Sequence, residues 1–236
     1  MSQRGKQRTK LRKKEQLQSK KRYAAYKQSF VDNIRKFDDP ILKQVCITYK
    51  YGLERWSEKE LKIAGDMSRT LIFNKGGVGL AANQIGYDVA IIATKSKSDM
   101  KPLIMFNPEI ISHGDKTLRA VEGCLSYPGY YPLVERYLSI KIKYIDINCK
   151  EVEKDYEDFE ARIVQHEVDH ISGKCLVGEF WELSKTNPEI IKQNELEAIS
   201  LYNGQKLEQK EYEVVESEDF KKEKQSKEIE EIKSES

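Results

Sequence analysis

The chain has 236 residues, of which 39% are hydrophobic and 34% are charged, so it is long enough for one good-sized domain with extensions. Its 41 Lys and Arg residues nearly balance 39 Asp and Glu residues, and the net charge of +2 points to no particular partner. No apolar run is long enough for a membrane span or a signal peptide, and four widely spaced cysteines without a CxxC pair indicate a reduced, cytoplasmic compartment.

Charge is unevenly distributed along the chain. Residues 1–30 carry eleven Lys or Arg and one Glu, whereas residues 186–236 carry eight Lys and fourteen acidic residues. Stretches dominated by one sign of charge are typical of solvated tails. We therefore predict a basic arm over 1–30 and a Glu/Lys-rich extension over 186–236, each helical or disordered, around a globular domain over 31–185. The arm has only two leucines to build an apolar face, which disfavours an organelle transit peptide.

Within the globular part, spacing predicts a helix, several strands and a second helix. The first helix spans 57–75, with Ser57 and Glu60 as a capping box. Its expected buried stripe comprises Leu61, Ala64, Met67, Ser68, Leu71 and Ile72. The runs with β-like composition are 89–94, 102–111 and 138–147. Helical spacing returns over 158–173, and this order favours an α+β fold with antiparallel pairing over repeated βαβ units.

The second predicted helix contains QHEVDH at residues 165–170, with two histidines four positions apart. At about 100° per residue, one side comprises Ala161, Val164, Val168 and Ile171, and the opposite side Ile163, His166, Glu167 and His170. A helix with apolar residues on one face and a polar cluster on the other is expected to lie between two layers of the fold. The two imidazoles share a face and can hold one metal ion, and the alternative is a pair of core histidines satisfied by hydrogen bonds.

A catalytic metal needs a third protein ligand, and His113 is the only other histidine. The segment VEGCLSYPGYYP, residues 121–132, offers Cys124, whose thiolate would complete a set of three ligands with an open position. Taken alone, a free cysteine is more often a small buried hydrophobe. A further stretch, GGVGLAANQIG, has glycines that let the backbone of a ligand approach, and Gln84 offers an amide donor. The alternative is a plain glycine-rich connection.

Together, GVGLAANQ, EGCLS and QHEVDH resemble the three signature motifs of the peptide deformylase family, in the order of that family. The upstream DDPILKQV resembles the usual start of its domain, and the resemblance covers roughly residues 34–182. It implies antiparallel β-sheets around a central metal-binding helix, in a peptide deformylase-like catalytic domain. It also implies a hydrolase that removes the formyl group from the N-terminal formylmethionine of newly made polypeptides.

The resemblance further implies the roles of individual residues. The residues assigned to one divalent metal ion are Cys124, His166 and His170. Fe²⁺ is the usual metal of the family, and the same ligands suit Zn²⁺, Ni²⁺ and Co²⁺. A metal-bound water is then the nucleophile, and Glu167 is the general acid/base. The oxyanion would be stabilised by the side-chain amide of Gln84 and the backbone N–H of Leu125.

N-formylmethionyl peptides are the implied substrates, bound as an added strand. The residues that the resemblance places against the peptide are Val78, Gly79, Gly123 and Ile163. Tyr131 departs from the family, because many bacterial members have an arginine there, and it predicts a more aromatic rim. Arg136 matches a family arginine, and we interpret it as a partner of Glu122 or Asp169, the latter pointing away from Glu167 on the helix.

Two other classes of protein remain open. A zincin-like metallopeptidase shares HExxH but normally takes its third ligand from downstream, where this chain has no histidine. A non-catalytic ribosome- or RNA-binding protein would explain the basic arm but not the metal-ligand pattern. A formate-release assay separates the three classes. For the arm itself, ten Lys or Arg within residues 1–22 point to ribosomal RNA, with a solvated leader as the alternative.

Overall fold

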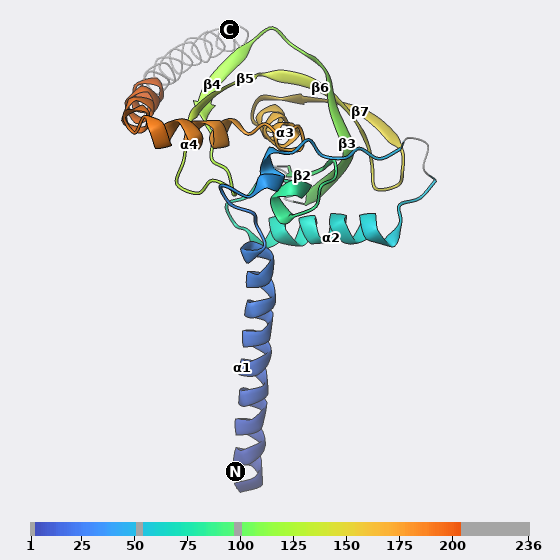
Figure 1. The fold of residues 1–236 in the computed structure, drawn as a ribbon. Coiled ribbons are helices and arrows are strands. Elements are labelled where there is room, and N and C mark those ends of the chain that lie inside the picture. The colour runs from blue at the N-terminus through green and yellow to red at the C-terminus, as the bar shows by residue number, and fades with distance from the viewer. Residues whose placement is uncertain (1–2, 51–53, 97–100, 204–236) are drawn as a thin grey trace, which may run out of the picture. The chain divides into compact units, whose positions relative to one another are not determined.

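The computed structural model describes residues 3–50, 54–96 and 101–203 (Figure 1). The chain divides into two compact units, Met1–Leu183 and Ser184–Ser236. The elements are α1 (Gln3–Asp32), the 3₁₀ helix η1 (Pro40–Lys43), α2 (Glu58–Phe73), β1 (Gly79–Ala81), the 3₁₀ helix η2 (Ala82–Ile85), β2 (Ile91–Lys95), β3 (Pro102–His113), β4 (Thr117–Val121), β5 (Leu133–Tyr137), β6 (Ser139–Ile145), β7 (Glu151–Glu157), α3 (Asp158–Ile171) and α4 (Leu176–Thr186). Among the described helices, none is both long and apolar enough to cross a bilayer.

Among the described residues, the strands β1 to β7 pair only in antiparallel fashion, in two sheets. The larger sheet has the order β1-β2-β3-β6-β7, and the smaller sheet pairs β4 with β5. β1 is an edge strand and pairs with β2, with Gly79 opposite Thr94 and Ala81 opposite Ile92. The predicted α+β fold with antiparallel sheets is therefore confirmed.

Alternate residues of β2 pack on opposite sides of the larger sheet. Ile91 and Ala93 belong to the core cluster that includes α2, whereas Ile92 belongs to the cluster that includes Ala161 and Val164 of α3. Helix α3 also contacts β5 of the smaller sheet, so it lies between the two sheets, as its two-faced pattern predicted (Figure 1). The motif-bearing helix is thus held from both sides.

The predicted strand runs correspond to β2, β3 and β6, and the second predicted helix is α3. At the start of α2, the carboxylate of Glu60 accepts a hydrogen bond from the N–H of Ser57 at 2.9 Å, as the capping pattern predicted. The strands β1, β4, β5 and β7 and the helix α4 were not predicted. In β7 only Tyr156 is buried, so this strand lacks an alternating apolar pattern.

The predicted buried stripe of α2 is partly wrong. Leu61 and Ile72 are 46% and 54% exposed, whereas Ile63 and Thr70 are buried. Apolar side chains occur on both sides of this helix, and the larger sheet covers the side that carries Ile63. The choice between the two sides is a tertiary effect that helical spacing alone does not determine.

A glycine just after α3 allows a close crossing of two segments. Gly173 has a φ of +69°, and a Cβ atom there would lie 2.8 Å from the backbone oxygen of Lys43. Nearby, the N–H of Cys46 donates to the carbonyl of Ile171 at 2.8 Å. The segment after η1 therefore secures the last turn of α3, which carries His170.

We predict that Gly173→Ala lowers the free energy of unfolding by about 1–3 kcal/mol, because it adds a strained φ and a backbone clash. Gly65→Ala is the matched control in the interior of α2, where the nearest atoms belong to the flexible end of Arg69. There the exchange should raise stability by up to about 1 kcal/mol. Urea unfolding followed by circular dichroism measures both changes, and equal stability of the two variants would contradict the prediction.

Candidate metal centre and active site

Three ligand atoms from two segments meet beside α3. The Sγ of Cys124 and one ring nitrogen each of His166 and His170 lie within 4.8 Å of one another. The histidines are one helical turn apart on α3, and the cysteine comes from the connection between β4 and β5. The Sγ of Cys124 lies 3.2 Å from the Nε2 of His170. His113 lies outside this cluster and stacks on Tyr137, with ring centroids 3.6 Å apart.

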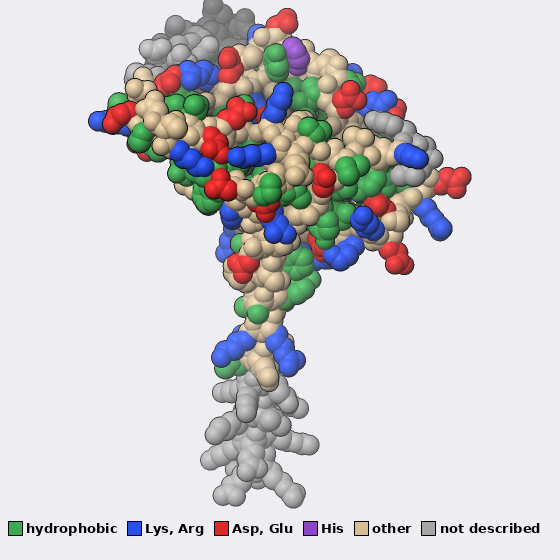
Figure 2. Space-filling model, in the orientation of Figure 1, with side chains coloured by type: hydrophobic (Ala, Val, Ile, Leu, Met, Phe, Trp, Pro, Cys, Tyr) green, Lys and Arg blue, Asp and Glu red, His purple; other side chains and the backbone are tan. Residues whose placement is uncertain are grey.

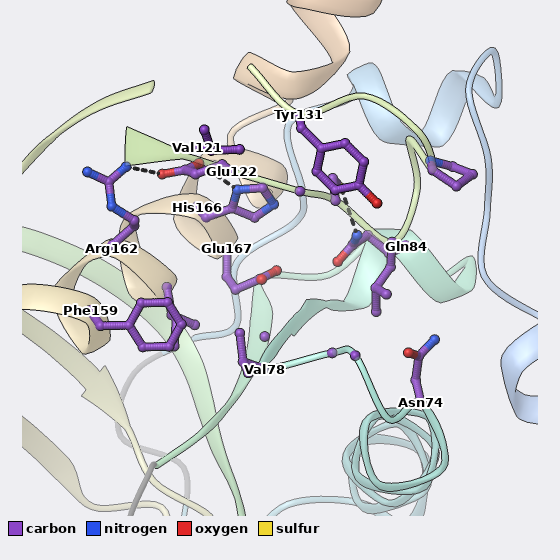
Figure 3. Close-up of a pocket in the computed structure, with 18 of the residues that line it drawn as sticks. Asn74, Val78, Gln84, Val121, Glu122, Tyr131, Phe159, Arg162, His166 and Glu167 are labelled. Carbon is purple, nitrogen blue, oxygen red and sulfur yellow. Dashed lines mark hydrogen bonds and ion pairs between the residues drawn. The ribbon is translucent and has the colours of Figure 1, made fainter. Parts of the chain in front are cut away.

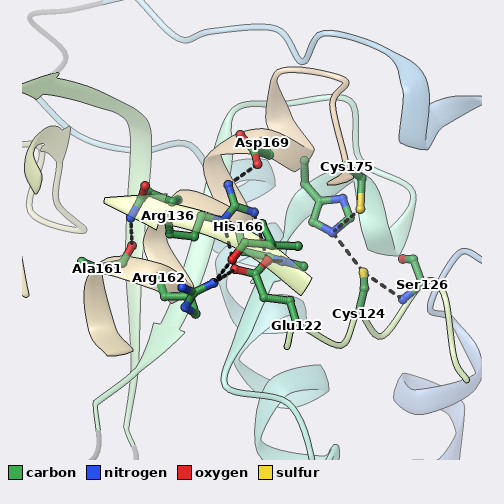
Figure 4. A network of polar contacts seen from close by, with 12 residues as sticks. Glu122, Cys124, Ser126, Arg136, Ala161, Arg162, His166, Asp169 and Cys175 are labelled. Carbon is green, nitrogen blue, oxygen red and sulfur yellow. Dashed lines mark hydrogen bonds and ion pairs between the residues drawn. The ribbon is translucent and has the colours of Figure 1, made fainter. Parts of the chain in front are cut away.

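A buried carboxylate orients one of the ligands. The Oε2 of Glu122 lies 2.9 Å from the Nδ1 of His166, which leaves the Nε2 for a metal (Figure 4). Arg136 and Arg162 donate to the same carboxylate at 3.0 and 2.7 Å. Burial alone would raise the pKa of Glu122, but hydrogen bonds from His166 and Arg136 outweigh it and lower this pKa to about 2. Glu122 therefore stays ionised and holds the His166 ring in one orientation.

Two residues near the site were missed by the sequence analysis. Arg162 lies on α3 one turn before His166 and also donates to the carbonyl of Val134 at 3.0 Å. The signal that could have identified Arg162 is its charge on an otherwise buried face of the helix. Cys175 has its Sγ 3.7 Å from the Nε2 of His170 but is not part of the three-atom cluster. No pattern in the sequence pointed to this thiol.

Arg136 was expected to pair with Glu122 or Asp169, and it pairs with both. Its Nε donates to Glu122 at 3.0 Å, and its Nη1 donates to the carboxylate of Asp169. Figure 4 shows Asp169 on the far side of Arg136 from Glu122. Asp169 thus fixes the arginine and does not face the cluster of ligand atoms.

The donor set and a buried carboxylate oxygen fit a divalent transition metal. One thiol and two imidazoles suit such an ion and leave a coordination position open. The Oε2 of Glu167 is buried without a hydrogen-bond partner among the described residues. Burial raises the pKa of Glu167. A buried carboxylate without a partner is unfavourable, and a nearby cation with its water would satisfy it.

The cluster borders a cavity of about 510 Å³ (Figure 3). The predicted catalytic and substrate-binding residues that line it are Val78, Gly79, Gln84, Gly123, Leu125, Ile163 and Glu167. Cys124 and His166 also line the cavity, whereas His170 is fully buried. Tyr131 stands at its edge and is 58% exposed. The structure therefore brings all the predicted site residues to one place.

Gln84 is held in one orientation by η2 and the adjacent loop. Its Oε1 accepts from the N–H of Ala81 at 2.8 Å, and its Nε2 donates to the Oγ of Ser126 at 3.1 Å. The same Nε2 lies 3.5 Å from the Sγ of Cys124. The backbone N–H of Leu125 has no hydrogen-bond partner among the described residues. Two N–H donors therefore lie close to the predicted thiolate ligand.

The edge strand β1 approaches the glutamate closely. A Cβ atom at Gly79 would lie 2.2 Å from the Oε1 of Glu167, so only a glycine fits without moving that carboxylate. Figure 3 shows Glu167 and Gln84 reaching the same cavity from different elements. The cavity therefore places an acid, two N–H donors and the ligand cluster around one small volume.

An open coordination position beside a buried carboxylate is typical of hydrolytic metal enzymes, whereas structural metal sites are closed by four ligands. A sequence model of the polypeptide deformylase family matches residues 31–187. The chain therefore belongs to the peptide deformylase family.

Individual relatives support this assignment. Peptide deformylase of Pseudothermotoga lettingae is 35% identical over 147 residues, which are 62% of this chain and 81% of that protein. Peptide deformylase 1 of Vibrio vulnificus is 41% identical over 113 residues, 48% of this chain and 67% of that protein. The actinonin-bound class I type b peptide deformylase from Acinetobacter baumannii has a TM-score of 0.56 and 34% identity, covering 61% of this chain and 94% of that chain. Peptide deformylase from Thermotoga maritima also has a TM-score of 0.56, at 33% identity, covering 61% of this chain and 93% of that chain.

We predict that Cys124→Ala and His166→Ala each weaken metal binding by at least about 100-fold, because loss of a ligand should cost more than the 10–100-fold effect of outer contacts. His113→Ala is the control, since this histidine lies outside the cluster. Metal content after dialysis, measured by inductively coupled plasma mass spectrometry, reports the result. One equivalent of metal retained by Cys124→Ala would rule the thiol out as a ligand.

Proposed function

We propose that the protein removes the formyl group from the N-terminal formylmethionine of newly made polypeptides. The observation that carries this proposal is the cluster of Cys124, His166 and His170 beside the buried carboxylate of Glu167 in one cavity. In the reaction, water adds to the formyl carbon and the C–N bond breaks. The products are formate and a free amino terminus.

We propose Fe²⁺ as the metal in the cell, with Zn²⁺, Ni²⁺ or Co²⁺ as substitutes that suit the same thiolate and imidazole ligands. When bound, such a cation polarises the scissile carbonyl and lowers the pKa of the attacking water. Cys124, His166 and His170 would hold it. Glu122 supports this role by keeping the Nδ1 of His166 engaged.

Glu167 is the group that moves the proton in this proposal. Its burial raises its pKa, which makes the carboxylate a better proton acceptor. It takes a proton from the attacking water and delivers that proton to the leaving amine as the C–N bond breaks. The side-chain N–H of Gln84 and the backbone N–H of Leu125 donate to the oxyanion that forms on the formyl carbon.

The substrate peptide would bind along β1 as an added strand. β1 pairs with β2 on one side, and no described strand pairs with its other edge. Val78 and Ile163 line the cavity and would form walls for the methionine side chain, with Gly79 and Gly123 against the peptide backbone. Tyr131 makes the rim aromatic, so we expect apolar residues after the methionine to be accepted.

We infer that the enzyme acts in the cytoplasm, where new polypeptides emerge. All four cysteines are free. Cys124 must remain a thiolate to bind a metal, and a reducing compartment preserves it in that form.

We predict that Glu167→Ala keeps its metal but lowers kcat by at least about 100-fold, because the proton transfer loses its carrier. Glu153→Ala, which removes an exposed carboxylate from β7, is the control. Formate release from a formyl-Met-Ala-Ser peptide and metal content are measured for both. Full activity of Glu167→Ala would refute the proposed mechanism.

We also propose that the basic arm binds ribosomal RNA and holds the enzyme near emerging chains. Residues 1–22 carry ten Lys or Arg against one Glu, and Figure 2 shows basic side chains on opposite sides of the described part of α1. At its other end, α1 packs on α2, with the rings of Phe30 and Tyr26 5.7 and 6.0 Å from that of Phe73. A basic helix fixed at one end would present its charge to phosphates.

Removal of residues 1–22 should abolish co-sedimentation with ribosomes at low salt and leave hydrolysis of a short formyl peptide unchanged. A chain that begins at Tyr23 keeps the aromatic contacts with α2. For the full chain, the logarithm of affinity should fall by about 0.7 to 0.9 per phosphate contact for each tenfold rise in salt. A chain without the acidic residues 204–236 is the control, and equal sedimentation of all three chains would show that the arm is a solvated leader.

A further inference from the structure

A second thiol lies beside the metal ligands and has no part in the proposed deformylation. Cys175 directly precedes α4, is 7% exposed and is not among the described residues that line the metal cavity. It belongs to a buried apolar cluster that includes Trp181 of α4, and Cys124 packs against the same cluster. The two cysteines are far apart in the chain and are neighbours in the fold.

The sulfur atoms of these two cysteines meet at one imidazole. The Sγ of Cys124 lies 3.2 Å from the Nε2 of His170, and the Sγ of Cys175 lies 3.7 Å from the same atom. The two thiols also share a hydrogen bond. Figure 4 shows their sulfur atoms pointing toward one another. A disulfide requires side chains in this arrangement, because the bond tolerates little deviation from its geometry.

The two thiols differ in their access to solvent. Cys124 is partly buried and lines the metal cavity, whereas Cys175 is enclosed by its apolar cluster. A small oxidant that enters the cavity therefore meets Cys124 first. The proposed role of Cys124 as a metal ligand also requires a thiolate, which is the form of cysteine that peroxides oxidise.

We propose that Cys175 is a resolving thiol that captures oxidised Cys124 in a reversible disulfide. In the first step, the Cys124 thiolate takes one oxygen atom from hydrogen peroxide, which gives a sulfenic acid and hydroxide. In the second step, the sulfur of Cys175 attacks the sulfenic sulfur and the S–O bond breaks. The thiol proton leaves with that oxygen as water. The two cysteines are oxidised together, and the peroxide is reduced to water and hydroxide.

The disulfide would empty the metal site without destroying it. A disulfide sulfur is not a thiolate, so the site would keep two imidazoles and lose the metal. Without a resolving thiol, further peroxide carries the sulfenic acid on to sulfinic and sulfonic acids, which thiols do not reduce. Cys175 would therefore make inactivation by peroxide reversible. The inference rests on Cys124 as a metal ligand and not on the proposed deformylation.

Peroxide treatment of the zinc-loaded full chain tests the proposal, since zinc itself is not redox-active. The remaining free thiols are blocked with N-ethylmaleimide, and tryptic peptides are analysed by mass spectrometry. The peptides of Cys124 and Cys175 should be joined, with the loss of their thiol hydrogens, and the zinc content should fall as this pair appears. Dithiothreitol with fresh zinc should then restore about one equivalent of metal.

Cys175→Ala is the deciding variant. Before oxidation it should bind zinc as the original chain does, because Cys175 is not part of the ligand cluster. After the same peroxide treatment and reduction it should recover less than about a tenth of its zinc, because Cys124 has passed to the sulfinic or sulfonic acid. Cys149→Ala is the matched control, since it removes a free thiol from the connection between β6 and β7, and it should recover its zinc.

Cys175→Val places an apolar side chain in the buried cluster and is the second variant if Cys175→Ala does not fold. The proposal is overturned if the oxidised original chain contains no disulfide between Cys124 and Cys175. It is equally overturned if the folded variants of Cys175 recover zinc after reduction as fully as the original chain does. Loss of zinc by Cys175→Ala before any oxidation would make Cys175 a metal ligand and would also overturn the resolving role.

Discussion

The contact between Glu122 and His166 joins the two segments on which the site depends. Glu122 precedes Cys124 in the connection after β4, and His166 lies on α3, so one carboxylate sets the cysteine segment against the histidine helix. Taking this carboxylate out of water is unfavourable unless it is well paired. Arg136 from β5 and Arg162 from α3 provide that pairing, which also ties the smaller sheet to the helix.

The parts of the site that depend on local spacing were predictable from the sequence. His166 and His170 fall on one face of a helix because they are four residues apart, and the same geometry put Val164 in the core. The third ligand, Cys124, could not be predicted from local spacing. Nothing local connects Cys124 to that helix, and only the joint resemblance of three motifs to a known family predicted that the two would meet.

Features decided by tertiary packing could not be predicted in this way. Which side of α2 is covered depends on the larger sheet, so Leu61 was expected inside and lies outside. β7 has one buried side chain and therefore no alternating pattern to detect.

The close approach of Gly79 to Glu167 has a consequence for how the family can vary. Because a side chain at position 79 would displace the carboxylate of Glu167, this position should remain glycine while activity is under selection. Changes in peptide preference are therefore expected at the exposed rim of the cavity instead. Tyr131 stands there and is largely exposed. Substitutions that alter substrate preference should occur at that rim, while position 79 stays glycine.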